Sequence, residues 1–120
     1  MKEPLYPLKT TVAVINLDGL QPFGRTSDLG SVGGQSSLDR DLGALAKSSG
    51  RDFAVTNSPL FYGSDQAPFA ITGVPAIFVA SGDTDLKGTT IIQEKLTEAG
   101  KCIHQPCDVP HDDWDLSGQR

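Results

Sequence analysis

The sequence lacks any cluster of basic residues and any long apolar run. Its 10 lysines and arginines are scattered among 15 acidic residues, which gives a formal net charge of −5. Because nucleic-acid binding depends on clustered cations, nucleic acid is not an expected partner. No apolar run approaches the roughly 18 residues of a membrane helix, so no membrane span is expected. Residues 1–9 carry charges and two prolines instead of an apolar core, so we do not expect them to form a signal peptide. We expect any export signal to lie upstream of this chain.

Cysteine is nearly absent, and the two that occur, Cys102 and Cys107, are five positions apart. Two ordinary thiols are the simplest interpretation. A small disulfide loop is the alternative in an oxidising compartment, although two cysteines do not make a disulfide framework. Their spacing also differs from the C-x-x-C pairs of structural zinc sites, so the cysteines themselves do not predict a metal.

The length and composition fit one compact domain. The chain has 120 residues, of which 38% are hydrophobic and 21% charged. A domain of this size buries enough surface to form a hydrophobic core. Thr11–Leu17 and Ala76–Ala80 are almost wholly apolar, which predicts two strands of one sheet that are covered on both faces. Asp52–Thr56 is a third, shorter strand candidate. The segment 21–34 is rich in Gly, Ser and Asp and is expected to be a loop.

Three helices are expected between and after these strands. Leucines at positions 38, 42 and 45 have helical spacing, with Ser36 or Ser37 as the N-cap and Gly50 after the last turn. Ser64–Asp65 is expected to cap a short helix over Gln66–Thr72, which Gly73 ends. Thr90–Ala99 has one apolar face and predicts the third helix. The tail from Lys101 is expected to be irregular and held to the body by Trp114.

The alternation of strands and helices predicts an α/β layered fold, in which ligands bind beyond the carboxyl ends of the strands. Asp18 follows the first strand directly, although an Asp-Gly turn would place it there too. Asp65 has the position of a helix-capping carboxylate. His104 lies in a loop stiffened by proline, where Asp108 could orient its imidazole. His111 is expected at the surface. Each of these signals is weak alone.

Together, the segments AVINLDG, YGSDQAPFAITGVPAIFVASG and IHQPCDVPHDDWDLSG resemble the C-terminal half of the zinc aminopeptidases of metallopeptidase family 28. The resemblance extends from Pro4 to Gly118. It implies a mixed sheet flanked by helices, part of the family's three-layer fold, with residues 1–120 as the C-terminal part of the peptidase domain. The implied activity is removal of N-terminal residues from peptides, with two zinc ions as cofactors.

The resemblance also implies roles for particular residues. Asp18 corresponds to the zinc-binding Asp of the family's Asn-x-Asp motif, and His104 to the zinc-binding His of its Tyr-His-x-Pro motif. Asp65 and Asp108 are expected at the pocket behind these ligands. Two zincs about 3.5–4 Å apart would polarise a peptide carbonyl, and one would hold the substrate's free amino group. We therefore expect Asp18, Asp65 and His104 to converge at one end of the sheet.

The sequence departs from the family pattern in three ways. It has no Glu-Glu pair, and its only His-x-Asp, His111–Asp113, lies at the wrong end. Ile103 stands where the family commonly has Tyr, and Gln66 stands where the family has His. In the family, Asp18 and His104 would serve different zincs, so each metal would keep one protein ligand of the roughly three that a catalytic zinc needs.

These departures leave three hypotheses about function. The first is the C-terminal portion of a zinc aminopeptidase that is inactive as an isolated chain, with a peptide as substrate and either a homo-oligomer or a complementing N-terminal half as partner. The second is a non-catalytic protein that retains the fold to bind a peptide or a partner subunit. The third is an unrelated α/β binding module. If half of the domain is missing, an exposed strand edge should favour self-association.

Overall fold

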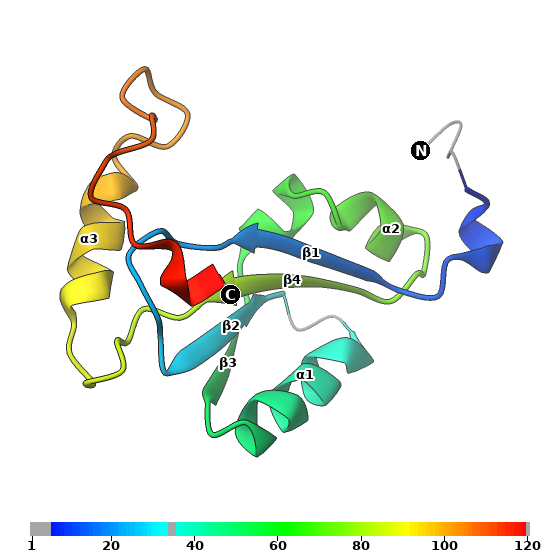
Figure 1. Ribbon diagram of the computed structural model, residues 1–120. Coiled ribbons are helices and arrows are strands. Elements are labelled where there is room, and N and C mark those ends of the chain that lie inside the picture. The colour runs from blue at the N-terminus through cyan, green and yellow to red at the C-terminus, as the bar shows by residue number, and fades with distance from the viewer. Residues whose placement is uncertain (1–5, 34–35, 120) are drawn as a thin grey trace.

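The computed structural model describes residues 6–33 and 36–119, and a four-stranded mixed sheet forms its centre (Figure 1). In space the strands follow the order β1 (Val14–Gly19), β4 (Ala76–Ser81), β2 (Asp28–Val32) and β3 (Asp52–Thr56). β1 runs parallel to β4 and β2 runs parallel to β3, whereas β2 and β4 are antiparallel. The predicted α/β fold with a mixed sheet is therefore confirmed.

The described residues also form three α-helices and three short 3-10 segments. The helices are α1 (Ser37–Ser48), α2 (Ala67–Ile71) and α3 (Ile91–Ala99), and the 3-10 segments are η1 (Leu8–Thr10), η2 (Pro59–Gly63) and η3 (Leu116–Gln119). None of the helices in this part of the chain is long and apolar enough to cross a membrane.

Helix α1 and the segment η2–α2 cover opposite faces of the sheet (Figure 1). Side chains of successive strand residues point to opposite faces, and directly paired residues share a face. Ser31 of β2 donates a hydrogen bond to the first turn of α1, so its side chain lies on the face that α1 covers. Val79 of β4 pairs with both Ser31 and Leu17, so Val79 and Leu17 lie on the same face. Asn16, one position before Leu17, donates to Gln66 at the start of α2. The sheet therefore has a helical layer on each side.

Helix α1 forms where the leucine spacing predicts it. Its N-cap is Ser36, whose side chain accepts a hydrogen bond from the Leu38 N–H, while the Asp39 carboxylate accepts one from the Ser36 N–H. This reciprocal capping box satisfies two backbone donors that a helix start otherwise leaves unpaired. Gly50 follows the helix with φ 71°, a conformation that suits glycine at this position. The third leucine of the pattern, Leu45, is 63% exposed.

Strand β2 lies within the segment 21–34, so the prediction of a loop there was wrong. Its sequence, DLGSV, lacks the apolar run that marks a buried strand, yet it pairs with β4 on one side and β3 on the other. Ser31 explains why a polar residue fits this interior position: it is 1% exposed and its hydroxyl donates to the buried carboxylate of Asp39. A satisfied polar group can replace an apolar one in a core.

Strand β1 is correctly predicted as a strand of the same sheet as β4, but its predicted burial on both faces was wrong. Ile15 and Leu17 are 65% and 59% exposed. The reason is position, because β1 is one of the two edge strands of the described sheet and α1 packs chiefly over the other, β3. By contrast, β4 is internal, and its residues Ala76 and Ile77 are buried as predicted.

The short helix differs from expectation at its start. α2 begins at Ala67, its N-cap is Gln66, and no side chain caps it, so Ser64 and Asp65 are not its caps. Gly73 has φ 87° and ends the segment as predicted. The strand β3 has the predicted bounds, and α3 begins one residue later than predicted.

Candidate functional site

Asp18 lies at the carboxyl end of β1, beside a bulge. Leu17 pairs with Val79 and Gly19 pairs with Ala80, so the register shifts at Asp18, which has no partner of its own on β4. A bulge of this kind bends the strand and redirects a side chain. Gly19 permits the close approach, because a Cβ there would lie 2.5 Å from the Ala80 Cβ. The bulge therefore helps to aim the Asp18 carboxylate beyond the sheet edge.

A chain of hydrogen bonds holds the Asp18 carboxylate. The Ser64 hydroxyl donates to Asp18 Oδ2 at 2.7 Å. Asn16 Nδ2 donates both to Ser64 Oγ at 3.0 Å and to Gln66 Oε1 at 2.9 Å. Gln66, which is fully buried, donates its Nε2 to the Phe61 carbonyl oxygen at 2.8 Å. The buried amide thus anchors the network from inside, and Asp18 receives the last hydrogen bond at its exposed end.

The network shows which residues of the Ser-Asp-Gln segment act on Asp18. Asp65, the predicted pocket residue, is exposed at the turn before α2, whereas its neighbours Ser64 and Gln66 make the contacts described above. Sequence reasoning gave Gln66 no role beyond its departure from the family's His, and it did not single out Asn16. The Asn-x-Asp spacing was the available signal, because residues two apart on a strand share a face.

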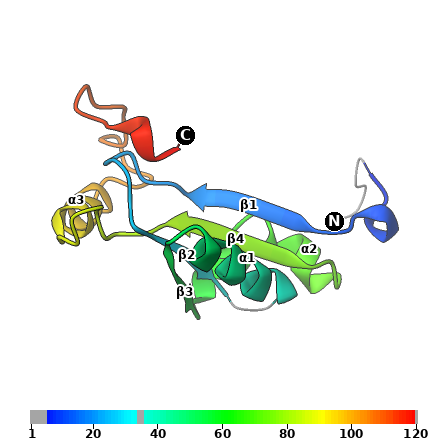
Figure 2. The ribbon, with the colours of Figure 1, turned by 60° about the horizontal axis from the view of Figure 1, so that its bottom comes forward.

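A pocket of about 960 Å³ opens beside Asp18, between the segment that follows β1, helix α3 and the C-terminal tail. Figure 2 shows these segments gathered at the end of the sheet toward which β1 points. Much of the lining is apolar and comes from seven large side chains: Leu20, Phe23, Leu96, Ile103, Val109, Trp114 and Leu116. Such a lining with a few polar groups is typical of a small-molecule site.

The charged residues of the pocket are mainly acidic. Asp18, Asp108 and Asp113 line it, as does Glu98, which pairs with a lysine outside the lining. Lys95 is the lysine of the lining, and its ammonium lies 5.6 Å from the centroid of the Phe23 ring. The excess of carboxylates favours a ligand that carries a positive charge.

The C-terminal tail is held against the pocket by its backbone. The Asp115 N–H donates to the Pro22 carbonyl at 2.9 Å, and the Gly24 N–H donates to the Asp115 carbonyl at 2.8 Å. Trp114 is half-buried, in agreement with the expectation that it holds the tail. The Asp115 carboxylate accepts hydrogen bonds from Ser117, and these hold its pKa below the ordinary value of 3.8. The bond from the Ser117 side chain has the larger effect and the bond from its backbone the smaller one.

The loop that carries His104 forms another part of the pocket wall. A disulfide joins Cys102 to Cys107, so the simpler interpretation of two free thiols was wrong. Cys102, Ile103, Cys107 and Asp108 line the pocket, and His104 is exposed in the same loop with φ 60°. Asp108 Oδ2 accepts a hydrogen bond from the His104 backbone N–H at 3.2 Å. The carboxylate that we expected to orient the imidazole thus contacts the main chain.

The residues of this chain do not fit a complete zinc centre. In the described residues, no group of three or more His, Cys, Asp or Glu side chains is placed to hold a metal ion. A catalytic zinc requires about three protein ligands. The pocket thus brings the Asp18 and His104 segments to one region, but without the ligand set that two metals would need.

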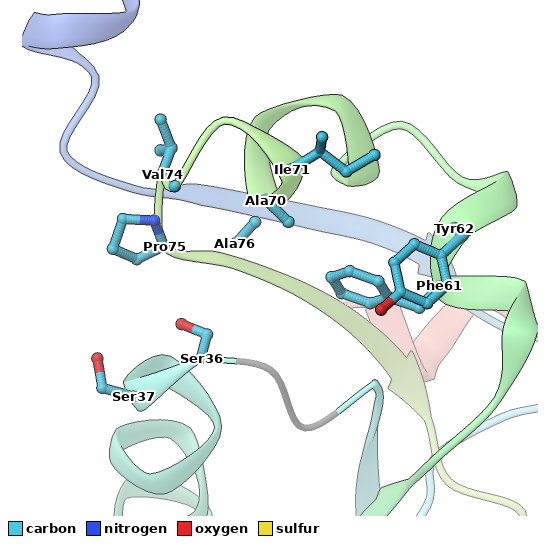
Figure 3. A pocket seen from close by; sticks show the side chains of 10 residues that line it. Ser36, Ser37, Phe61, Tyr62, Ala70, Ile71, Val74, Pro75 and Ala76 are labelled. Carbon is cyan, nitrogen blue, oxygen red and sulfur yellow. The ribbon is translucent and has the colours of Figure 1, made fainter.

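A second pocket, of about 410 Å³, lies at the opposite end of β4 (Figure 3). It is bounded by Ser36 and Ser37 at the start of α1, by the aromatic pair Phe61 and Tyr62, and by Pro75. No carboxylate or histidine is among its lining residues. Catalysis at a peptide bond needs such groups, so the pocket beside Asp18 is the better candidate site.

The comparison with protein families decides the chain's ancestry. The model for peptidase family M28 matches residues 1–119. The chain belongs to peptidase family M28. Because the match covers residues 1–119, the resemblance in the sequence is confirmed at the level of the family. The family consists of metallopeptidases that are generally zinc-dependent. No curated protein and no solved structure matches the chain.

Membership of family M28 gives the geometry around Asp18 a context. The three segments that carried the resemblance all reach the same region: β1 with Asp18, the turn with Ser64, and the disulfide loop with Asp108. The parallel pairing of β1 with β4 brings the carboxyl ends of both strands, and with them Asp18 and the chain that leads to α3, to one end of the sheet, and the hydrogen bond from Ser64 to Asp18 joins the turn to the same end.

Proposed function

We propose that this chain is the C-terminal portion of a zinc-dependent aminopeptidase, which removes N-terminal residues from peptides. The observation that carries the proposal is the apolar pocket with acidic residues beside Asp18, in a chain of family M28. On this proposal residues 1–120 supply the substrate-binding side of the site, with Asp18 and His104 as metal ligands and Asp65 and Asp108 near them.

The pocket supports the proposed preference for a free N-terminus. A peptide's first residue combines an α-ammonium group with a side chain, and the pocket offers carboxylates beside an apolar surface. When no metal is bound to Asp18, the carboxylates of Asp18 and Asp108 would attract the ammonium group, while side chains such as Leu96 and Trp114 would contact an apolar substrate side chain. That contact excludes water from the pocket, and the lower local dielectric strengthens the attraction between the ammonium group and the carboxylates.

The incomplete ligand set requires a complementing segment, which we propose to be the N-terminal half of the peptidase domain. Two exposed side chains, Ile15 and Leu17, support this, because β1 leaves both its outer edge and part of the α1 face uncovered in the described sheet. A strand pairing with β1, and a helix over these side chains, would remove that exposure. Self-association of the isolated chain is expected on the same grounds.

A non-catalytic binding protein is the second candidate function. It is favoured by one observation, the lack of a three-ligand metal group in the described residues. Such a protein would use the same pocket for the N-terminal residue of a peptide without cutting it. Catalysis thus separates the two candidates, whereas binding is common to both.

Binding is tested first, with leucinamide, N-acetyl-leucinamide and glycinamide titrated into the purified chain by NMR. We expect leucinamide to bind, and acetylation to weaken its binding about tenfold, roughly 1.4 kcal/mol, because the ammonium charge is lost. Glycinamide should bind more weakly because it lacks the apolar side chain. Asp18→Asn should weaken leucinamide binding. Asp112→Asn, an exposed carboxylate outside the pocket lining, is the matched control and should have no effect.

Two outcomes would contradict the proposal. Equal binding of leucinamide and its acetylated form would exclude recognition of the amino group. Zinc-dependent release of p-nitroaniline from leucine p-nitroanilide by the isolated chain, abolished by a chelator, would mean that the chain or a second copy holds a complete centre. Mass in solution, measured on the same sample, tests self-association.

A further inference from the structure

The conformation of His104 is unusual for its residue type. Among the described residues it is the one non-glycine residue with a positive φ, at 60°. Left-handed backbone is uncommon for side chains with a Cβ and persists where surrounding contacts impose it. The loop that contains His104 is exposed, so packing alone does not explain the conformation.

A disulfide and two hydrogen bonds impose this conformation. The disulfide between Cys102 and Cys107 closes a ring around residues 103–106. Within that ring the Gln105 N–H donates to the Cys102 carbonyl at 2.8 Å, and outside it the Asp108 carboxylate accepts from the His104 N–H at 3.2 Å. The disulfide restricts the conformations of the loop, and the hydrogen bond to the Asp108 carboxylate fixes the backbone of His104.

The same disulfide forms part of the pocket wall. Both of its cysteines line the cavity beside Asp18, together with Ile103 and Asp108. Cys102 is half-buried and Cys107 is exposed, so Cys107 is the more accessible of the two cysteines to a reagent in solvent. A change in the disulfide therefore alters both the His104 backbone and one side of the cavity.

We propose that the Cys102–Cys107 disulfide is a reducible clasp that regulates the pocket. The reductant is a dithiol. One of its thiolates attacks the sulfur of Cys107, the more exposed cysteine, the S–S bond breaks, and Cys102 leaves as a thiolate that takes up a proton. The second thiol of the reagent then displaces Cys107. The protein disulfide gains two electrons and two protons, and the dithiol becomes a disulfide.

The clasp rests on the proposed function only in naming the ligand of the pocket. In the oxidised chain the disulfide closes the loop, and the loop forms its part of the pocket wall. In the reduced chain the loop gains the conformations that the ring excluded, so His104 leaves the left-handed region and the cavity loses a fixed wall. Leucinamide should therefore bind less well after reduction.

The loop itself is tested without any ligand, by trypsin cleavage after Lys101 in the oxidised and dithiol-treated chain. We expect cleavage at least about tenfold faster after reduction, because the short loop no longer limits local opening. Cys102→Ser with Cys107→Ser should be cleaved rapidly without reductant and should not respond to the dithiol. Asp108→Ala, which keeps the disulfide, should give an intermediate rate.

NMR signals of the Trp114 indole and the His104 amide report on the wall and the loop in the same samples. The clasp is overturned if alkylation shows both thiols free while the cleavage rate and both signals stay unchanged. Failure of the proposed function gives a different result, in which the oxidised chain binds no leucinamide although reduction still accelerates cleavage. Slower cleavage after reduction would also overturn the clasp.

Discussion

Replacement of the buried Gln66 by leucine tests how the candidate site is anchored. The side chain is 0% exposed, and its amide makes two hydrogen bonds, from Asn16 at 2.9 Å and to the Phe61 carbonyl at 2.8 Å. A leucine side chain has a volume similar to that of glutamine but can make neither of these hydrogen bonds. Gln66→Leu thus removes the hydrogen bonds while leaving little cavity.

The magnitude follows from the groups that lose a partner. Loss of a partner for a buried polar group costs about 1–3 kcal/mol. The Phe61 carbonyl loses this donor, whereas Asn16 keeps its second bond, to Ser64. We therefore expect Gln66→Leu to lower the free energy of unfolding by about 1–3 kcal/mol, a large part of a typical domain's stability.

Chemical denaturation with urea, monitored by circular dichroism, measures this difference. Gln93→Leu, the same chemical change at an exposed position of α3, is the matched control and should stay within about 0.5 kcal/mol of the unmodified chain. NMR signals of the Asn16 side-chain amide should move in the first variant and not in the second. If both variants unfold at the same urea concentration, Gln66 does not anchor the network and the reasoning is wrong.

Three other substitutions test neighbouring parts of the molecule. Asp39→Ala should lower the free energy of unfolding by about 2 kcal/mol, measured in urea, because it removes a helix cap and the partner of the buried Ser31 hydroxyl. Hydrogen bonds from Thr89 hold the pKa of Asp85 below its ordinary value of 3.8, so their stabilisation is complete above pH 3.8 and is lost as pH falls through the lowered value. Asp85→Asn should therefore flatten the dependence of urea unfolding on pH below 3.8, and an unchanged slope would contradict this. Gly19→Ala should destabilise by about 1–3 kcal/mol and weaken leucinamide binding, since its Cβ would lie 2.5 Å from a Cβ of β4.

Elements with a strong local pattern could be predicted from the sequence. The leucine spacing and Ser36 located α1, and the apolar run of β4 located an internal strand. Both depend on short-range physics: a cap satisfies the first turn, and an apolar run requires cover. The family resemblance located Asp18 and the segment of His104 at the candidate site, and the bulge and the disulfide loop now show how each is held there.

Features that depend on distant partners could not be predicted in the same way. Strand β2 is internal although its sequence is polar, because Ser31 finds Asp39 on a helix that the strand alone does not reveal. The exposure of Ile15 follows from the strand order, which no local pattern encodes. Ser64 has the residue type of a helix cap, yet its hydroxyl donates to Asp18 instead. In each case a tertiary contact outweighed local preference.

The strand order also has a consequence for the sequence of events in folding. β2, α1 and β3 follow one another along the chain, so their contacts close only short loops, whereas Val14 of β1 must find Ala76 of β4. Closing a long loop loses more chain entropy before any contact compensates for it, so non-local pairings form slowly. We expect the β2–α1–β3 unit to assemble first and β1 to join last. The Asp18 end of the molecule should then be the first to open in native-state hydrogen exchange, well before the capped start of α1.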